Sequence, residues 1–134
     1  MINHKELLKC ANEAMERAYV PYSKFKVGAA VLMSSGKIYT GCNIENASYG
    51  ATNCAERTAI FKAVSEGETE IKAVAIVSSG KEFTYPCGIC RQVITEFMKD
   101  GEFIFENANG EVKVVSLDEM FPYRFTKADL LGEE

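Results

Sequence analysis

The stretch Ile71-Lys72-Ala73-Val74-Ala75-Ile76-Val77 is a nearly unbroken apolar run of about the length of one strand. Such a run is typical of a strand that is covered on both faces. A helix is predicted on each side of it in the sequence: residues 54–66, followed by Gly67, and a segment that begins after Pro86 and ends at Gly101. In the second helix we expect five apolar side chains to point inward: Ile89, Val93, Ile94, Phe97 and Met98. The middle of the chain therefore alternates helix and strand.

A helix and a hairpin are predicted ahead of this unit. Residues 3–19 carry apolar side chains at helical spacing, and Asn3 and Glu6 have the spacing of a capping box at the start of the helix. Residues 26–34 and 37–42 are prone to form strands and are separated by turn residues, which predicts an antiparallel hairpin.

After the second helix of the unit, residues 103–105 and 112–115 flank the tight turn Asn107–Gly110 and are predicted to be antiparallel neighbours. Two short helices should follow, capped by Ser116 with Glu119 and by Thr126 with Asp129. The elements sum to an α/β fold, namely an α/β/α sandwich in which a five-stranded mixed sheet lies between helical layers.

Length and composition predict one domain that covers residues 1–134. The chain has 134 residues, of which 47% are hydrophobic and 25% are charged, a balance typical of globular proteins. Its formal net charge of −4 disfavours nucleic acid as a partner, because such binding depends on neutralising phosphates. The longest mostly apolar stretch, Val27–Met33, is far shorter than the roughly 20 residues of a membrane span. We therefore expect neither a nucleic-acid nor a membrane partner.

The first residues of the chain carry mixed charge and lead into an amphipathic pattern, unlike a signal peptide, so we expect a cytoplasmic protein. The chain has five cysteines: Cys10, Cys42, Cys54, Cys87 and Cys90. In a reducing compartment, an odd number with one Cys-x-x-Cys argues for metal or redox chemistry over disulfides.

Three of the cysteines lie at the predicted starts of two helices. Cys54-Ala55-Glu56 opens one helix and Pro86-Cys87-Gly88-Ile89-Cys90 opens another. Helix N-termini stabilise thiolates, the form in which cysteine binds a metal ion. If the two helix starts meet, three soft ligands hold zinc and leave the fourth tetrahedral position open, as in catalytic sites. Cys10 and Cys42 are expected to be small buried side chains, and the only histidine, His4, lies outside every motif.

Glu56 follows the first of these ligands by two residues. A carboxylate at this spacing can stand beside the metal and move protons between water and substrate. Considered alone, a glutamate in a first helical turn is usually solvated and favoured by the helix dipole, and a lone Cys-x-x-Cys could be a redox pair or a structural site. A ligand two residues before a glutamate, together with Pro-Cys-x-x-Cys, is the signature of zinc-dependent base deaminases.

Four motifs extend this signature: Phe25-Lys26-Val27-Gly28-Ala29-Ala30, Gly41-Cys42-Asn43-Ile44-Glu45-Asn46-Ala47-Ser48-Tyr49, Cys54-Ala55-Glu56-Arg57 and Pro86-Cys87-Gly88-Ile89-Cys90-Arg91-Gln92. In this order they resemble the small, homotetrameric, three-cysteine cytidine deaminases over nearly the whole chain. The resemblance implies the cytidine deaminase fold and a zinc ion held by Cys54, Cys87 and Cys90. It also implies hydrolytic deamination of cytidine and deoxycytidine to uridine and deoxyuridine in pyrimidine salvage. Ammonia is released, and Glu56 moves the protons.

The resemblance implies further roles around the zinc motif. Asn43 and Glu45 would hydrogen-bond the ribose hydroxyl, although an ordinary polar loop has the same composition. Phe25 would pack on the nucleoside, and the backbone of Ala55 would address the edge of the pyrimidine. Arg57, about one helical turn after Cys54, is expected to donate to ligand sulfurs and offset the charge of three thiolates on one dication.

Other family residues act between subunits. In the resembling tetramers, the segment that corresponds to Ala47–Tyr49 and an aromatic side chain at the place of Phe125 contribute to a neighbouring site. We therefore expect a homotetramer with shared active sites, in which Ala47, Tyr49 and Phe125 complete the substrate site. Phe125 could instead hold the tail on its own sheet. Arg91 and Gln92 resemble residues near the site and are given no catalytic role.

Three other functions stay open from the sequence. A deaminase of tRNA or single-stranded nucleic acid should have a basic surface and often a helix between the last strands, against which the acidity and the turn at 107–110 argue. A blasticidin-type deaminase shares the zinc motif, but Phe25 and the segment 43–45 favour a nucleoside. A non-catalytic zinc or thiol-redox module needs the cysteines but not Glu56.

Overall fold

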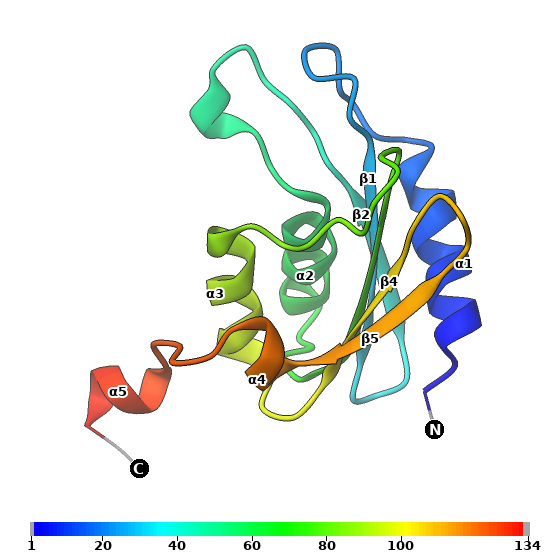
Figure 1. Cartoon of the computed structure of the whole chain (residues 1–134). Helices are drawn as coiled ribbons and strands as arrows, with labels where there is room; N and C mark the ends of the chain where they lie inside the picture. Colours follow the sequence, from blue (N-terminus) through cyan, green and yellow to red (C-terminus); the bar gives the residue numbers. More distant parts are fainter. Residues whose placement is uncertain (1, 133–134) are drawn as a thin grey trace.

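The computed structural model describes residues 2–132 (Figure 1). In chain order the elements are α1 (His4–Met15), β1 (Val27–Met33), β2 (Ile38–Cys42), the 3-10 helix η1 (Tyr49–Ala51), α2 (Ala55–Ser65), β3 (Ile71–Ser78), α3 (Gly88–Phe97), β4 (Glu102–Glu106), β5 (Val112–Ser116), α4 (Leu117–Met120) and α5 (Lys127–Leu131). Across residues 2–132, no helix combines the length and the apolar character that a membrane span requires.

One five-stranded mixed sheet forms the middle of the molecule, in the order β2-β1-β3-β4-β5. The β1–β2 and β4–β5 hairpins are antiparallel, as is the β1–β3 pair, whereas β3 and β4 are parallel and are joined through α3. Figure 1 shows α1 on one face of the sheet and α2 and α3 on the other. The predicted α/β/α sandwich is confirmed.

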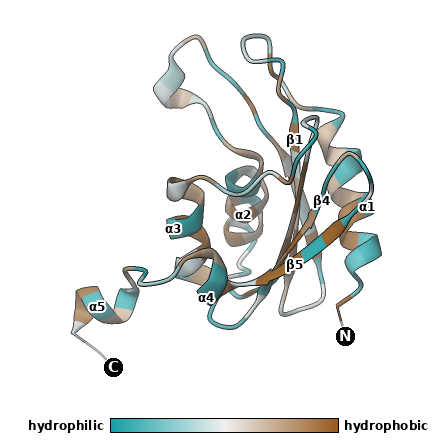
Figure 2. Ribbon diagram, in the orientation of Figure 1, coloured by the Kyte–Doolittle hydropathy of each residue, from teal (hydrophilic) through white to brown (hydrophobic). Residues whose placement is uncertain are grey.

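β3 is buried on both faces, as its apolar run predicts. Val74 and Ile76 pack in the core under α2 and α3, while Ala73, Ala75 and Val77 pack in the core under α1. Figure 2 shows the strands in the middle of the sheet at the hydrophobic end of the scale. Each helical layer therefore has its own apolar face of the sheet to cover.

Two glycines let the helices approach the sheet. A Cβ atom at Gly28 in β1 would lie 2.1 Å from the carbonyl oxygen of Ala11 in α1. A Cβ atom at Gly41 in β2 would lie 2.5 Å from the carbonyl oxygen of Ala55 in α2. Since no side chain fits at such distances, both positions require glycine unless a helix moves. Gly41 thereby places the start of α2 directly on the edge of the sheet.

The first helix is shorter than predicted, because α1 ends at Met15 and not at residue 19. The backbone N–H of Tyr19 donates to the carbonyl oxygen of Asn43, and the N–H of Glu45 donates to the carbonyl oxygen of Tyr19. The segment after α1 therefore pairs with the chain beyond β2. This long-range pairing replaces the last helical turn that the local pattern predicts.

α3 also differs from the prediction at both ends. It stops at Phe97 and not at Gly101, so that Met98 is its C-cap residue with an extended backbone, and one predicted inward side chain of its first turn is exposed. Ile94 and Met98 are buried, and Val93 and Phe97 pack half-buried on the core, but Ile89 is 62% exposed. Successive helical residues point about 100° apart, so the first turn of α3 can bury only one side of the helix. The buried side chain in that turn is Cys90.

The side chains of Asn3, Ser116 and Thr126 each accept a backbone N–H at the start of α1, α4 and α5, as predicted, although at α1 the return hydrogen bond of the predicted capping box is not formed among the described residues. For α4 and α5 the complete capping box forms. Figure 1 shows α5 at the end of an arm that extends away from the sheet. Leu130 and Leu131 are exposed on this arm.

Candidate active site

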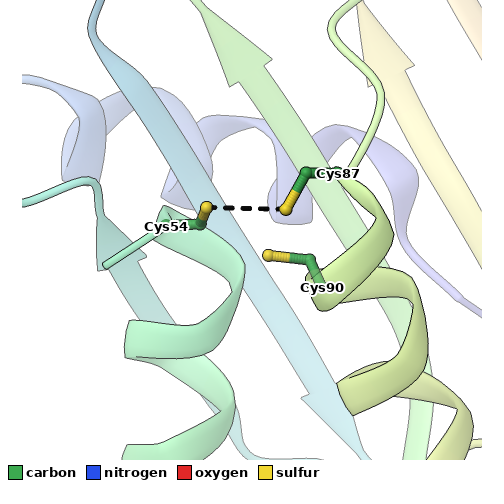
Figure 3. Close-up of side chains that lie close together, drawn as sticks. All are labelled: Cys54, Cys87 and Cys90. Atoms are coloured by element: carbon green, nitrogen blue, oxygen red, sulfur yellow. Dashed lines mark hydrogen bonds between the residues drawn. The ribbon is translucent and has the colours of Figure 1, made fainter. Parts of the chain in front are cut away.

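Three cysteine thiols meet between the starts of α2 and α3 (Figure 3). The Sγ atoms of Cys54, Cys87 and Cys90 lie within 4.8 Å of one another, and those of Cys54 and Cys87 are 3.8 Å apart. Tetrahedral zinc, bonded to sulfur at about 2.3 Å, holds its sulfur ligands about 3.8 Å apart. The Cys54 and Cys87 thiols have this spacing, and the Cys90 thiol is near enough to serve as the third ligand. Cys10 and Cys42 lie outside this group, and both are half-buried and not fully buried as expected.

Cys54 and Cys87 are the N-cap residues of α2 and α3, so the two thiols meet where the starts of these helices lie side by side (Figure 3). In the described part of the chain, neither thiol hydrogen-bonds the first turn of its own helix. The Thr58 hydroxyl lies 3.1 Å from the carbonyl oxygen of Cys42 and 3.2 Å from that of Cys54, which ties the start of α2 to the end of β2. The positive ends of two helix dipoles thus face the thiols and favour thiolates.

Arg57 supplies the positive charge beside the sulfurs. Its Nη2 donates to Cys54 Sγ at 3.3 Å, and its Nε is buried without a hydrogen-bond partner among residues 2–132. None of the ion pairs within these residues joins Arg57 to a carboxylate. Three thiolates, one zinc dication and one guanidinium have zero net charge together, so the donor set fits zinc electrostatically as well.

The thiols do not lose their protons equally. A hydrogen bond from the Cys90 thiol, helped by the Arg57 guanidinium, lowers the pKa of Cys54. The same hydrogen bond and burial raise the pKa of Cys90. Cys54 is therefore the first of the two to become a thiolate.

Glu56 stands beside this group in the first turn of α2. It is 4% exposed, and it is the one charged side chain within residues 2–132 that is fully buried. Burial raises the pKa of Glu56 to about 7. Glu56 is therefore not the solvated glutamate that is usual in the first turn of a helix. Ala55, directly before it, is also buried and begins the helix.

Phe25 is contacted by two segments that are distant in the sequence. The Asn43 side chain accepts the Val27 N–H at 2.9 Å and donates to the Phe25 carbonyl oxygen at 2.8 Å. The Phe25 ring lies over Gly80, where a Cβ atom would come within 3.0 Å of the ring. Phe25 is nevertheless 39% exposed, so one part of the ring is free to contact a ligand. The sequence did not point to Gly80.

Glu45 is held by the loop between α1 and β1. The backbone N–H groups of Tyr22 and Ser23 donate to Glu45 Oε1 at 3.0 and 3.1 Å, and the Ser23 hydroxyl donates to Oε2. These hydrogen bonds, chiefly that from the hydroxyl, hold the pKa of Glu45 below its ordinary value. Sequence reasoning missed Ser23, although Pro21-Tyr22-Ser23 is a turn-forming triplet directly before Phe25.

The segment that carries Ala47 and Tyr49 lies on an exposed loop. Tyr49 is 79% exposed in η1, and its ring meets that of Tyr22 edge-on at 6.4 Å between centroids. In Figure 1 this loop extends beyond the end of the sheet, between β2 and α2. It thus presents an aromatic side chain outward.

Phe125 lies on the C-terminal arm and is 56% exposed. Its carbonyl oxygen accepts a hydrogen bond from Gln92 Nε2 of α3 at 2.8 Å. Arg91 donates to the carbonyl oxygens of Pro86 and Met120, at 2.8 Å each. The start of α3, which holds two of the thiols, is thereby tied to the segment that leads to Phe125.

Comparison with known proteins agrees with this geometry. Residues 1–107 match the cytidine and deoxycytidylate deaminase zinc-binding region. The chain is 48% identical over 130 residues to a cytidine deaminase of Halalkalibacterium halodurans, which covers 96% of this chain and 98% of that protein. A cytidine deaminase of Sporosarcina psychrophila is 48% identical over 127 residues, or 94% of this chain and 93% of that protein.

Among solved structures, the chain is similar to the crystal structure of a cytidine deaminase from Burkholderia pseudomallei. The TM-score is 0.87 and the sequence identity is 45%, over 92% of this chain and 100% of that chain. The match extends beyond the metal-binding segments to nearly all of the α/β/α sandwich. The chain therefore belongs to the family of cytidine and deoxycytidylate deaminases.

Proposed function

We propose that this chain is a zinc-dependent cytidine deaminase that hydrolyses cytidine and deoxycytidine to uridine and deoxyuridine. The observation that carries this proposal is the convergence of three thiols on one point, with the carboxyl group of Glu56 buried beside them. A metal site built only for structure has no use for an adjacent buried carboxyl group, which costs stability. The proposed substrate is that of the related cytidine deaminases.

The chain's own residues divide the chemistry between them. Cys54, Cys87 and Cys90 hold zinc, and Arg57 offsets their negative charge. When bound by three protein ligands, zinc lowers the pKa of a water molecule and so supplies a nucleophile near neutral pH. Glu56 accepts the first proton of the water that attacks C4 and gives it to the ring nitrogen, and it then passes the second proton of that water to the leaving amine. The C4–N bond breaks, oxygen replaces the amino group, and ammonia leaves.

The substrate is held by groups around this centre. The part of the Phe25 ring that is exposed packs on the nucleoside. Asn43 keeps one N–H and one lone pair after its contacts to Val27 and Phe25, and Glu45 keeps a free acceptor position. Both bind a ribose hydroxyl. The backbone of Ala55, at the start of α2, addresses the edge of the pyrimidine.

The working form is a homotetramer with shared active sites, in which residues 1–134 act as one domain. Ala47, Tyr49 and Phe125 complete a neighbouring subunit's site. The exposure of the two aromatic side chains supports this assembly. Tyr49 and Phe125 are 79% and 56% exposed on segments outside the sandwich, where a neighbouring subunit can cover them. We place the reaction in pyrimidine salvage in the cytoplasm, because free zinc-binding thiols persist in a reducing compartment.

Zinc content and uridine formation from cytidine, measured on the same sample, test this function. We expect one zinc ion per chain and turnover of cytidine and deoxycytidine. Bound zinc without any turnover would instead indicate a non-catalytic zinc module. Turnover of adenine in tRNA, with none of free cytidine, would indicate a nucleic-acid-editing enzyme.

A further inference from the structure

The carboxylate of Glu45 has little hydrogen-bonding capacity left. A carboxylate accepts about four hydrogen bonds, roughly two at each oxygen. Oε1 accepts two backbone N–H groups, from Tyr22 and Ser23, and Oε2 accepts the Ser23 hydroxyl. The loop therefore fills Oε1 and half of Oε2. A single acceptor position, on Oε2, is left for another donor.

Ser23 connects this carboxylate to the aromatic side chain of the site. Its hydroxyl gives its hydrogen to Glu45, and its oxygen accepts the N–H of Phe25 at 3.0 Å. Lys24, which lies between Ser23 and Phe25, has a φ of +62°, a conformation that side chains disfavour. The Lys24 N–H donates to the Val20 carbonyl oxygen at 3.1 Å, which connects the turn to the chain before it. The hydrogen bonds of the Ser23 hydroxyl and of the Lys24 N–H together fix the conformation of this loop.

We propose that Ser23 is a positioning residue for substrate selection: it directs the one free acceptor position of Glu45 toward a single sugar hydroxyl. This inference rests on the proposed function, in which Glu45 binds the sugar. If Ser23 loses its hydroxyl, Oε2 has two acceptor positions and the side chain of Glu45 can rotate. The enzyme then recognises the sugar hydroxyl less well, while the chemistry at C4 is unchanged.

The test combines two variants, one control and two substrates. Ser23→Ala removes the hydroxyl, and Ser23→Thr keeps it. The matched control is Ser79→Ala, because Ser79 Oγ also accepts one backbone N–H of this region, that of Lys26 at 3.0 Å, and is not among the hydrogen-bond donors of Glu45. Cytidine carries the 2′- and 3′-hydroxyls of the sugar, and 2′,3′-dideoxycytidine lacks both, so the hydroxyl that Glu45 is proposed to bind is one of these two groups.

For Ser23→Ala we expect the KM for cytidine to rise about tenfold, the size of one hydrogen bond to a charged group, with little change in kcat. The KM for 2′,3′-dideoxycytidine should stay nearly constant. Ser23→Thr should restore the KM for cytidine, and Ser79→Ala should affect both substrates alike. Equilibrium binding of the two nucleosides gives the same comparison without turnover.

An equal rise for both substrates in Ser23→Ala would overturn the inference, since the serine would then only maintain the loop. A further loss when Ser23→Ala is added to Glu45→Ala would overturn it too, because Ser23 is proposed to act through Glu45. Failure of the proposed function looks different: the unaltered protein then neither binds nor deaminates cytidine. Neither of the first two results would produce that pattern.

Discussion

The helices of this chain begin in two different ways. α1, α4 and α5 begin at Asn3, Ser116 and Thr126, whose side chains accept a backbone N–H of the first turn. α2 and α3 begin at Cys54 and Cys87, whose thiols make no such hydrogen bond within residues 2–132 and lie 3.8 Å apart. Because a missing cap costs about 1 kcal/mol, the two helices of the site have the less stable starts. Their N-termini are arranged for ligand binding and not for stability.

The largest effect should follow from removing a thiol. Replacing Cys54, Cys87 or Cys90 with Ala should abolish stoichiometric zinc binding, turnover and assembly, because two cysteines cannot complete the site. Zinc content by elemental analysis measures this. Cys10→Ser and Cys42→Ser are the controls and should keep their zinc. If zinc content instead followed Cys42, the assigned ligands would be wrong.

The second largest effect concerns the carboxyl group at the start of α2. Glu56→Gln should lower kcat about 10²- to 10⁴-fold, because an amide of nearly the same shape cannot accept and return a proton. Zinc content and the thermal unfolding midpoint should stay close to those of the unaltered protein. Steady-state kinetics with cytidine provide the measurement. Full turnover in this variant would remove Glu56 from the mechanism.

The helix α5 shows that a capped start does not ensure packing. It has a complete capping box, yet its Leu130 and Leu131 are exposed. A cap alone does not give a helix a surface to pack on. Burying Phe125 against a neighbouring chain would be worth about 1.5 to 3 kcal/mol. We expect Phe125→Ala to act mainly on substrate binding. The KM for cytidine should rise clearly, while the thermal unfolding midpoint should fall only slightly. Sedimentation should show a tetramer, and a fully active monomer would contradict shared sites.

The smallest effect tests the caps directly. Ser116→Ala should lower the free energy of unfolding by about 1 kcal/mol and leave zinc content unchanged. At the start of α2 the reverse exchange is available: Cys54→Ser supplies a capping hydroxyl. Without metal, Cys54→Ser should be more stable than Cys54→Ala by about 1 kcal/mol. Equal unfolding midpoints in denaturant for these two variants would show that α2 does not lack a cap.

Much of the site was predictable because its signals are local. The spacing of Cys54 to Glu56 and of Cys87 to Cys90 places each group at a helix start. That the two helices pack on one face of the sheet is seen only in the structure. The three thiols converge as predicted. The exposure of Ile89 was not predictable in the same way. Helical periodicity identifies the apolar face of a helix, but it does not show how far along the helix the rest of the protein covers that face.

The sequence by itself determined the order of helices and strands, the capped helix starts and the three thiols, since each depends on residues within a few positions of one another. Only the tertiary structure decided which loops meet. Glu45 contacts Ser23 across 22 positions, Asn43 contacts Phe25 across 18, and α1 ends early because Tyr19 pairs with the chain beyond β2. These contacts depend on how α1 and the β1–β2 hairpin pack, and periodicity and capping describe one element at a time.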